Sequence, residues 1–242
     1  MLEVGAGRVA WQERAIRLGL GAQDGTRYAN AQVDDCHQGG AAFRWRPPLR
    51  LQVEARFSHG VGELRGTAGF GFWNDPFGMT GKPRLDLPRT LWFFFAGPPS
   101  DLPLAVGVPG RGWKAATLDA RRWEALAALP SAPLVVPMLR IPWLYRWWWP
   151  RVQRRLRIGE AVVPVDLQAW HRYEIEWGVA QCRFWVDGLL ILHLPFAPGG
   201  PMGLVAWIDN QYMEMTPQGR FRHGVVMAQA QWLEIRRLQI VR

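Results

Sequence analysis

The chain of 242 residues has few cysteines and no long apolar run. Its two cysteines, Cys36 and Cys182, form no metal-ligand or redox motif, so we expect two free buried thiols, with a single bridge as the alternative. No apolar stretch reaches the ~18 residues of a membrane span. The N-terminal residues are acidic and polar where a signal peptide needs an apolar run, so we predict a cytoplasmic protein.

Lysine is scarce as well, and the net charge of +9 comes almost wholly from arginine. This charge has two interpretations: attraction to an anionic partner, or an Arg-rich composition with solvated charges. Tryptophan, in contrast, is abundant, with fifteen residues. Such a number is typical of deep cores, stacking platforms for ligands, or belts at a membrane interface.

Alternating apolar residues mark many short strands separated by Gly and Pro. The stretch from Trp170 to His193 alternates with a period of two on both sides of a turn, and Asp187-Gly188 predicts a hairpin. Residues 49–57 alternate cleanly, while residues 90–96 (TLWFFFA) are apolar on both faces and indicate a central buried strand. We predict a loop at residues 213–224 and two closing strands in residues 225–241.

Residues 121–160 differ from the rest and are predicted to be a Trp/Arg-rich insertion or lid within a single domain of residues 1–242. They lack strand alternation and contain five prolines and a run of three tryptophans, followed by arginines. Aromatic side chains beside Arg are typical of membrane-interface anchors, so Trp147, Trp148, Trp149 and Arg151 are candidates for contact with an anionic membrane. A lid that folds over the sandwich is the alternative. Nucleic acid is not expected as a partner, because no nucleic-acid-binding motif accompanies these residues.

Several motifs occur in an order that resembles a known family. These are LQVEARF, GFGFWND, WHRYEIEW, CRFWVDGLLILH, PMGLVAWIDN and LEIRRLQIVR, within residues 25–242 without the insertion. Together they resemble the concanavalin A-like jelly rolls, above all glycoside hydrolase family 16 with its laminarinase-like enzymes. The resemblance implies an all-β fold, a two-sheet antiparallel β-sandwich jelly roll, with a cleft on one face.

The catalytic motif of that family is missing. The family carries Glu-x-Asp-x-Glu on one strand, where two carboxyl groups about 5 Å apart perform retaining hydrolysis. The corresponding residues here, Arg89–Ala96, contain no carboxylate in either register. We therefore expect no retaining glycosidase activity at that site.

The replacement of acids by Trp and Phe predicts an apolar cleft floor, unless side chains fill the cleft. Such a cleft suits an apolar or amphiphilic small molecule. The strand ends that border the cleft in the family give the candidate ligand-binding residues: Trp73, Asn74, Trp92, Phe94, Trp185, Trp207, Asn210, Gln211 and His223. Asp209 and Asp75 are candidate general acids, because burial in an apolar pocket favours a neutral carboxyl group; each is also a candidate turn residue.

Three functions remain open from these residues. The first is non-hydrolytic binding of an apolar or amphiphilic molecule by a protein that is peripheral to a membrane. The second is an enzyme that acts on such a ligand by acid/base chemistry, such as cyclisation, isomerisation or hydration. The third is a carbohydrate-binding or divergent glycoside hydrolase family 16-like protein, in which sugars would stack on the aromatic rings. The cluster at residues 34–37 (Asp-Asp-Cys-His) is predicted to be a turn, since neighbouring residues on a strand point to opposite faces, and we expect neither metal nor cofactor.

Overall fold

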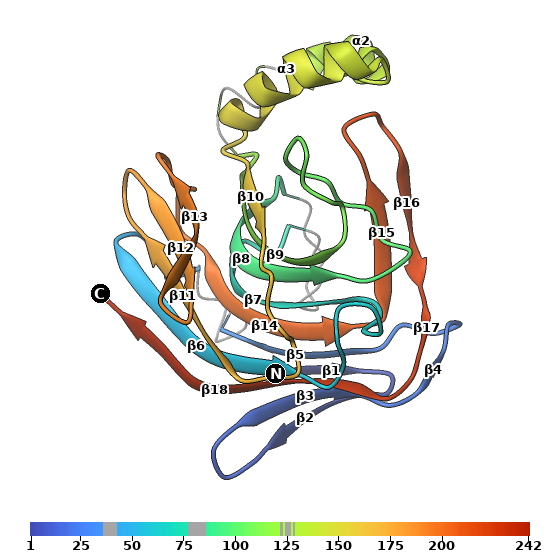
Figure 1. Cartoon of the computed structure of the whole chain (residues 1–242), viewed down its shortest axis with the longest axis vertical. Coiled ribbons are helices and arrows are strands. Elements are labelled where there is room, and N and C mark those ends of the chain that lie inside the picture. Colours follow the sequence, from blue (N-terminus) through green and yellow to red (C-terminus); the bar gives the residue numbers. More distant parts are fainter. Residues whose placement is uncertain (36–42, 77–85, 122, 124–126, 128) are drawn as a thin grey trace.

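The computed structural model describes residues 1–35, 43–76, 86–121, 123, 127 and 129–242. Two seven-stranded antiparallel sheets stack face to face (Figure 1). The first sheet has the order β1-β5-β14-β7-β8-β9-β10 and the second β13-β12-β11-β6-β18-β3-β2. The predicted two-sheet antiparallel β-sandwich of jelly-roll type is therefore confirmed.

The strands of the first sheet are β1 (Leu2–Val4), β5 (Asn30–Asp34), β14 (Gly203–Asp209), β7 (Thr67–Trp73), β8 (Arg89–Ala96), β9 (Gly112–Asp119) and β10 (Gly159–Val162). Those of the second are β13 (Leu189–Leu194), β12 (Cys182–Val186), β11 (His171–Trp177), β6 (Leu49–Phe57), β18 (Gln231–Val241), β3 (Ile16–Leu20) and β2 (Gly7–Trp11). Two small ribbons pair β15 (Gln211–Met215) with β16 (Phe221–Val225), and β17 (Met227–Ala228) with β4 (Gln23–Asp24). The helices are η1 (Leu129–Ser131), α2 (Ala132–Met138) and α3 (Pro142–Arg155).

The hydrophobic core lies between the two sheets and follows the alternation of the sequence. On β11 the side chains of Tyr173, Ile175 and Trp177 are buried, while their neighbours Glu174 and Glu176 face outward. The Asp187-Gly188 hairpin is confirmed, because both residues have positive φ (51° and 81°) and β12 pairs with β13 across them. Of the two cysteines, Cys182 is free and buried as predicted, whereas Cys36 lies outside the described residues, as does His37.

Two predictions near the C-terminus were wrong. Residues 213–224 are not a loop, because most of them form the β15–β16 ribbon; the Pro and Gly that favoured a loop occupy only its tip, where the Gly219 amide bonds to the Thr216 carbonyl. The two expected closing strands are mainly one long strand, β18. An irregularity between Arg236 and Gln239, with Arg237 at φ 50°, interrupts its alternation without ending the strand.

The segment predicted as an insertion contains helices α2 and α3, and its last two residues already belong to β10. A proline stands in the first turn of each helix, where its missing N–H costs no hydrogen bond. Helix α3 leads into β10, and α2 lies close to the tip of the β15–β16 ribbon (Figure 1). Arg140 Nε donates to the Gln218 carbonyl oxygen there, at 3.3 Å. None of the helices in the described residues combines the length and apolarity that crossing a membrane requires.

Candidate functional site

Strand β8 presents large apolar side chains on both of its faces. Leu91, Phe93 and Phe95 are fully buried in the core between the sheets. Trp92 and Phe94 alternate with them, so they lie on the opposite face of the first sheet, where they remain partly exposed. This is the face on which the sequence predicted an apolar cleft floor.

Two glycines of β7 make room for aromatic rings on that face. A Cβ atom added at Gly69 would lie 2.9 Å from the Trp207 ring, and one at Gly71 would lie 2.7 Å from Cβ of Trp92. These two glycines therefore allow close packing of rings from neighbouring strands.

Four aromatic side chains from β7, β8 and β14 form what we call the aromatic wall: Trp73, Trp92, Phe94 and Trp207. The Trp73 and Trp207 rings are stacked, with centroids 6.3 Å apart and an interplanar angle of 5°. Trp92 contacts both Trp207 at 5.2 Å and Phe94 at 5.4 Å. The wall is thus a continuous apolar surface contributed by adjacent strands.

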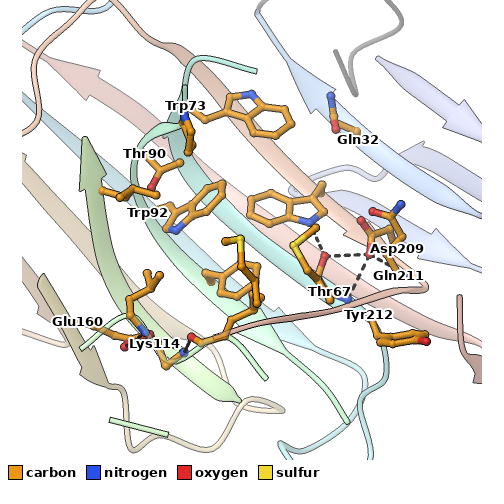
Figure 2. Close-up of a pocket in the computed structure, with 18 residues that line it drawn as sticks. Gln32, Thr67, Trp73, Thr90, Trp92, Lys114, Glu160, Asp209, Gln211 and Tyr212 are labelled. Atoms are coloured by element: carbon orange, nitrogen blue, oxygen red, sulfur yellow. Dashed lines mark hydrogen bonds and ion pairs between the residues drawn. The ribbon is translucent and has the colours of Figure 1, made fainter. Parts of the chain in front are cut away.

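A pocket of about 160 Å³ lies against the aromatic wall (Figure 2). Five further apolar side chains line it: Leu102, Leu104, Leu118, Met213 and Met215. The ribbon that carries the two methionines is held in place by main-chain bonds, since the amide of residue 215 bonds to the carbonyl of residue 101 at 2.9 Å. Polar groups gather at two separate ends of the pocket.

Asp209 stands at the first polar end. Its Oδ1 accepts hydrogen bonds from the Thr67 hydroxyl at 2.8 Å, the Thr67 amide at 3.2 Å and the Gln211 amide at 3.0 Å. The Thr67 hydroxyl in turn accepts from Nε1 of Trp207 at 3.0 Å. Burial raises the pKa of the Asp209 carboxyl to about 7, and these hydrogen bonds only partly offset the loss of solvation.

Lys114 and Glu160 form a buried ion pair at the second polar end. Lys114 Nζ lies 2.5 Å from Glu160 Oε1 and also donates to the carbonyl oxygens of Leu102 and Pro109, each at 3.0 Å. Glu160 Oε2 accepts from the amides of Leu104 and Ala105 at 3.0 and 2.9 Å. Burial lowers the pKa of Lys114 despite the attraction of Glu160. The pair ties residues 102–109 to β9 and β10 and so fixes one side of the pocket.

The structure brings six of the predicted site residues together around the pocket: Trp73, Trp92, Phe94, Trp207, Asp209 and Gln211. Asp75 is also buried, but it is not among the described residues that line the pocket. Asn74 holds the end of β7, where its Oδ1 accepts from the amide of Arg89 at 2.8 Å. Asn210 similarly holds the start of β5, since its Oδ1 accepts from the amide of Ala29 at 2.8 Å.

Two further predicted ligand-binding residues lie away from the pocket. Trp185 belongs to β12 in the second sheet and sits on its outer face, with the Arg50 guanidinium 5.9 Å from its ring. His223 is exposed on β16, beside Phe221. Strand alternation shows which residues share a face, but it does not show which sheet carries the pocket.

The four residues predicted to touch a membrane lie on α3. Trp147 and Trp148 are 52% and 36% exposed, and the Arg151 guanidinium stacks over the Trp147 ring at 4.1 Å. Trp149 is different, because its Nε1 donates to the Leu104 carbonyl oxygen at 2.8 Å. Since Leu104 lines the pocket, Trp149 connects the helix to the pocket's side.

Sequence reasoning missed Thr67, Lys114, Glu160, Met213 and Met215. Their part in the pocket depends on strand register, which pairs Thr67 with Asp209 and Glu160 with Ala116. One signal was available for Lys114: a lysine among the small apolar residues of GWKAATLD needs a buried partner. Within the described residues, no three His, Cys, Asp or Glu side chains gather as a metal site would need.

No protein-family model matches the chain, and no curated protein does. Several solved structures are similar in fold. They include the Bacillus licheniformis β-glucanase (TM-score 0.48, 10% identity, 97% of this chain and 82% of that chain). Others are a Thermotoga petrophila laminarinase catalytic domain (0.42, 11%, 95% and 81%) and a Clostridium perfringens endo-β-galactosidase (0.46, 14%, 95% of this chain but 53% of that one). These matches concern the fold alone.

Proposed function

We propose that the pocket binds a small apolar or amphiphilic molecule. The observation that carries this proposal is the aromatic wall, which lines a pocket of about 160 Å³ together with further apolar side chains. An engineered cavity of roughly 150 Å³ in another protein takes up benzene, so the space suits a ligand of at least that size. Because Trp92 and Phe94 are partly exposed, a ligand that covers them removes apolar surface from water, at roughly 25 cal/mol for each Å².

Ligand uptake tests this proposal directly. Native mass spectrometry of the purified protein should show a bound apolar molecule or uptake of added ones. Trp92→Ala should weaken uptake by about tenfold or more, because it removes the centre of the aromatic wall. Trp185→Ala is the matched control, since Trp185 is a half-buried tryptophan on the outer face of the other sheet. No uptake by the parent protein, or equal weakening in both variants, would contradict the proposal.

A carbohydrate is the alternative ligand, because sugar faces also stack on tryptophan. The described lining favours the apolar ligand, since apolar and aromatic side chains make up most of it, although Gln32 and Thr90 also line the pocket. Titration with laminari-oligosaccharides, compared in the parent and Trp92→Ala, distinguishes the two: saturable binding that the variant loses would favour the sugar.

An enzyme that uses acid/base chemistry is the second candidate function. Asp209 favours it, because a carboxyl group with a pKa of about 7 in an apolar pocket exchanges a proton near neutral pH. Once a transformed ligand is found, Asp209→Asn should abolish turnover and leave binding in place. If Asp209→Asn keeps both turnover and binding, Asp209 is not the catalytic acid.

We also propose that helix α3 docks on an anionic bilayer. Its exposed face carries Trp143 and Trp147, which are 67% and 52% exposed, and the sequence contains no acidic residue between Glu124 and Glu160 while it contains six arginines there. Indole rings suit the headgroup region and guanidinium groups attract anionic lipid, each worth about 1 kcal/mol near the surface. Trp149 connects this helix to the pocket, so docking would bring the pocket near the lipid.

Liposome flotation tests the membrane proposal. The parent should float with vesicles that contain phosphatidylglycerol and less with pure phosphatidylcholine. A Trp143→Ala/Trp147→Ala variant should lose most of that binding, whereas Trp11→Ala should keep it, since Trp11 is 67% exposed but lies on β2 of the second sheet. Flotation that is equal in all three proteins, or absent in the parent, would remove the idea.

A further inference from the structure

The hydrogen bonds of Asp209 differ from those of an ordinary buried carboxylate. All three hydrogen bonds that Asp209 accepts end on Oδ1, from Thr67 and from the Gln211 amide. Among the described residues, no arginine, lysine or histidine forms an ion pair with this carboxyl group, although it is only 1% exposed. An isolated buried carboxylate without a counter-charge is unfavourable, so this arrangement favours the neutral acid.

The same three bonds decide which oxygen carries the proton. Trp207 Nε1 can only donate, so the Thr67 hydroxyl accepts from it and gives its own hydrogen to Asp209 Oδ1. With two amide hydrogens also directed at Oδ1, a proton on the carboxyl group resides on Oδ2. Asp209 lines the pocket. Its Oδ2–H group is therefore the donor that remains for a molecule bound there.

The neighbours of Asp209 on this face are uncharged. Asn30 lies directly across from it in the β5–β14 register, and Gln32 follows on the same face and lines the pocket. Tyr28 is close enough for the Asp209 charge to raise its pKa, although burial is the larger cause, so it stays neutral near pH 7. The charged pair Lys114–Glu160 stands at the other end of the pocket (Figure 2).

We propose that neutral Asp209 recognises an oxygen atom of the ligand through Oδ2–H, so that the pocket selects molecules with an apolar body and one carbonyl, ether or hydroxyl oxygen. This rests on the proposed binding of an apolar or amphiphilic molecule. The aromatic wall holds the body of such a ligand, and Asp209 sets its orientation by bonding the oxygen at one end. A ligand without the oxygen gains only the apolar contacts.

The experiment uses two ligands of nearly equal shape, acetophenone and α-methylstyrene, which differ in C=O against C=CH₂. Their affinities are measured by ligand-observed NMR with the full chain at pH 5.5 and pH 8.5. At pH 5.5 we expect the ketone to bind about tenfold more tightly than the alkene, the ratio that one buried hydrogen bond supplies. At pH 8.5, where Asp209 is ionised and has no proton to donate, the ratio should fall to about one.

Asp209→Asn separates this effect from titration at the Lys114–Glu160 end. The amide oxygen of Asn keeps the three donors of Oδ1, and its NH₂ group replaces Oδ2–H, so the ratio should stay near tenfold at both pH values. A ratio near one at pH 5.5 in the parent overturns the proposal, and so does a pH-dependent ratio that persists in Asp209→Asn. If neither ligand binds the parent, the proposed function fails; if both bind equally at both pH values, only this inference fails.

Discussion

Replacing Lys114 with methionine removes one half of the buried ion pair and keeps most of the side-chain volume. The change deletes the contact to Glu160 Oε1 and the two bonds to the carbonyl oxygens of Leu102 and Pro109. Glu160 remains buried and keeps only its bonds from the Leu104 and Ala105 amides. The variant therefore leaves a carboxylate without a counter-charge in the interior.

We expect Lys114→Met to lower the free energy of unfolding by about 3–5 kcal/mol, the range for breaking one half of a buried pair. For a domain of this size that corresponds to a fall in Tm of roughly 6–20 °C. The double variant Lys114→Met/Glu160→Gln should recover much of the loss, because no charge is left buried. Burial lowers the pKa of Lys114 although the attraction of Glu160 raises it. The attraction within the intact pair therefore does little more than offset the cost of removing the charges from water.

Urea unfolding of the parent, both single variants and the double variant measures this as a double-mutant cycle. Ligand affinity in Lys114→Met should also fall, since residues 102–109 lose the two bonds that Lys114 makes to the carbonyl oxygens of Leu102 and Pro109. A loss below about 1 kcal/mol in Lys114→Met, or single losses that add without coupling in the double variant, would refute the reasoning.

Three further predictions concern stability. The pKa of Asp209 is about 7 in the folded protein against 3.8 in a free chain, so the protonated carboxyl group stabilises the fold below pH 4 and this contribution is lost as pH rises through 7. Urea unfolding should show a pH dependence of at most about 4 kcal/mol from this group, and Asp209→Asn should remove it. Gly69→Ala should destabilise by roughly 1–3 kcal/mol, because its Cβ would lie 2.3 Å from the Phe93 carbonyl oxygen, whereas Gly62→Ala, with nothing within 4 Å, should not. Glu234→Gln should lower the free energy of unfolding by roughly 1–3 kcal/mol at pH 7, because it weakens the bonds to the Arg17 and Arg56 guanidinium groups. At a pH where Glu234 is protonated the variant should lose nothing, and thermal unfolding at both pH values measures the difference.

The sequence predicted the sandwich well because strands of the second sheet alternate cleanly. Residues 171–177 and 182–186 show one apolar and one polar face each, and the Asp187-Gly188 turn fixes their pairing. Residues 90–96 were predicted to be a central buried strand, and β8 has that position between β7 and β9. The ribbon at residues 211–225 was missed because it stands apart from both sheets, so no buried face imposes a period on it.

The sequence left open what the abundant Trp and Arg residues do, and the structure shows that some of them stack on one another at the second sheet. The Arg236 and Arg56 guanidinium groups stack on the Trp170 ring at 4.1 and 4.8 Å, and Arg56 also pairs with Glu234 at 2.8 Å. Composition alone could not separate these stacked side chains from the aromatic wall, because Trp185 and Trp207 both alternate with core residues. The separation needs the strand order, which the sequence does not contain.

The position of the aromatic wall on the first sheet decides how the pocket should be interpreted. Trp92 and Phe94 line a pocket of about 160 Å³ together with Leu102, Leu104 and two methionines, side chains that are all able to pack against rings. The covering residues are held by polar bonds from Lys114, Glu160 and Trp149, so the space persists instead of collapsing. This persistence supports the proposed binding of a ligand in the pocket.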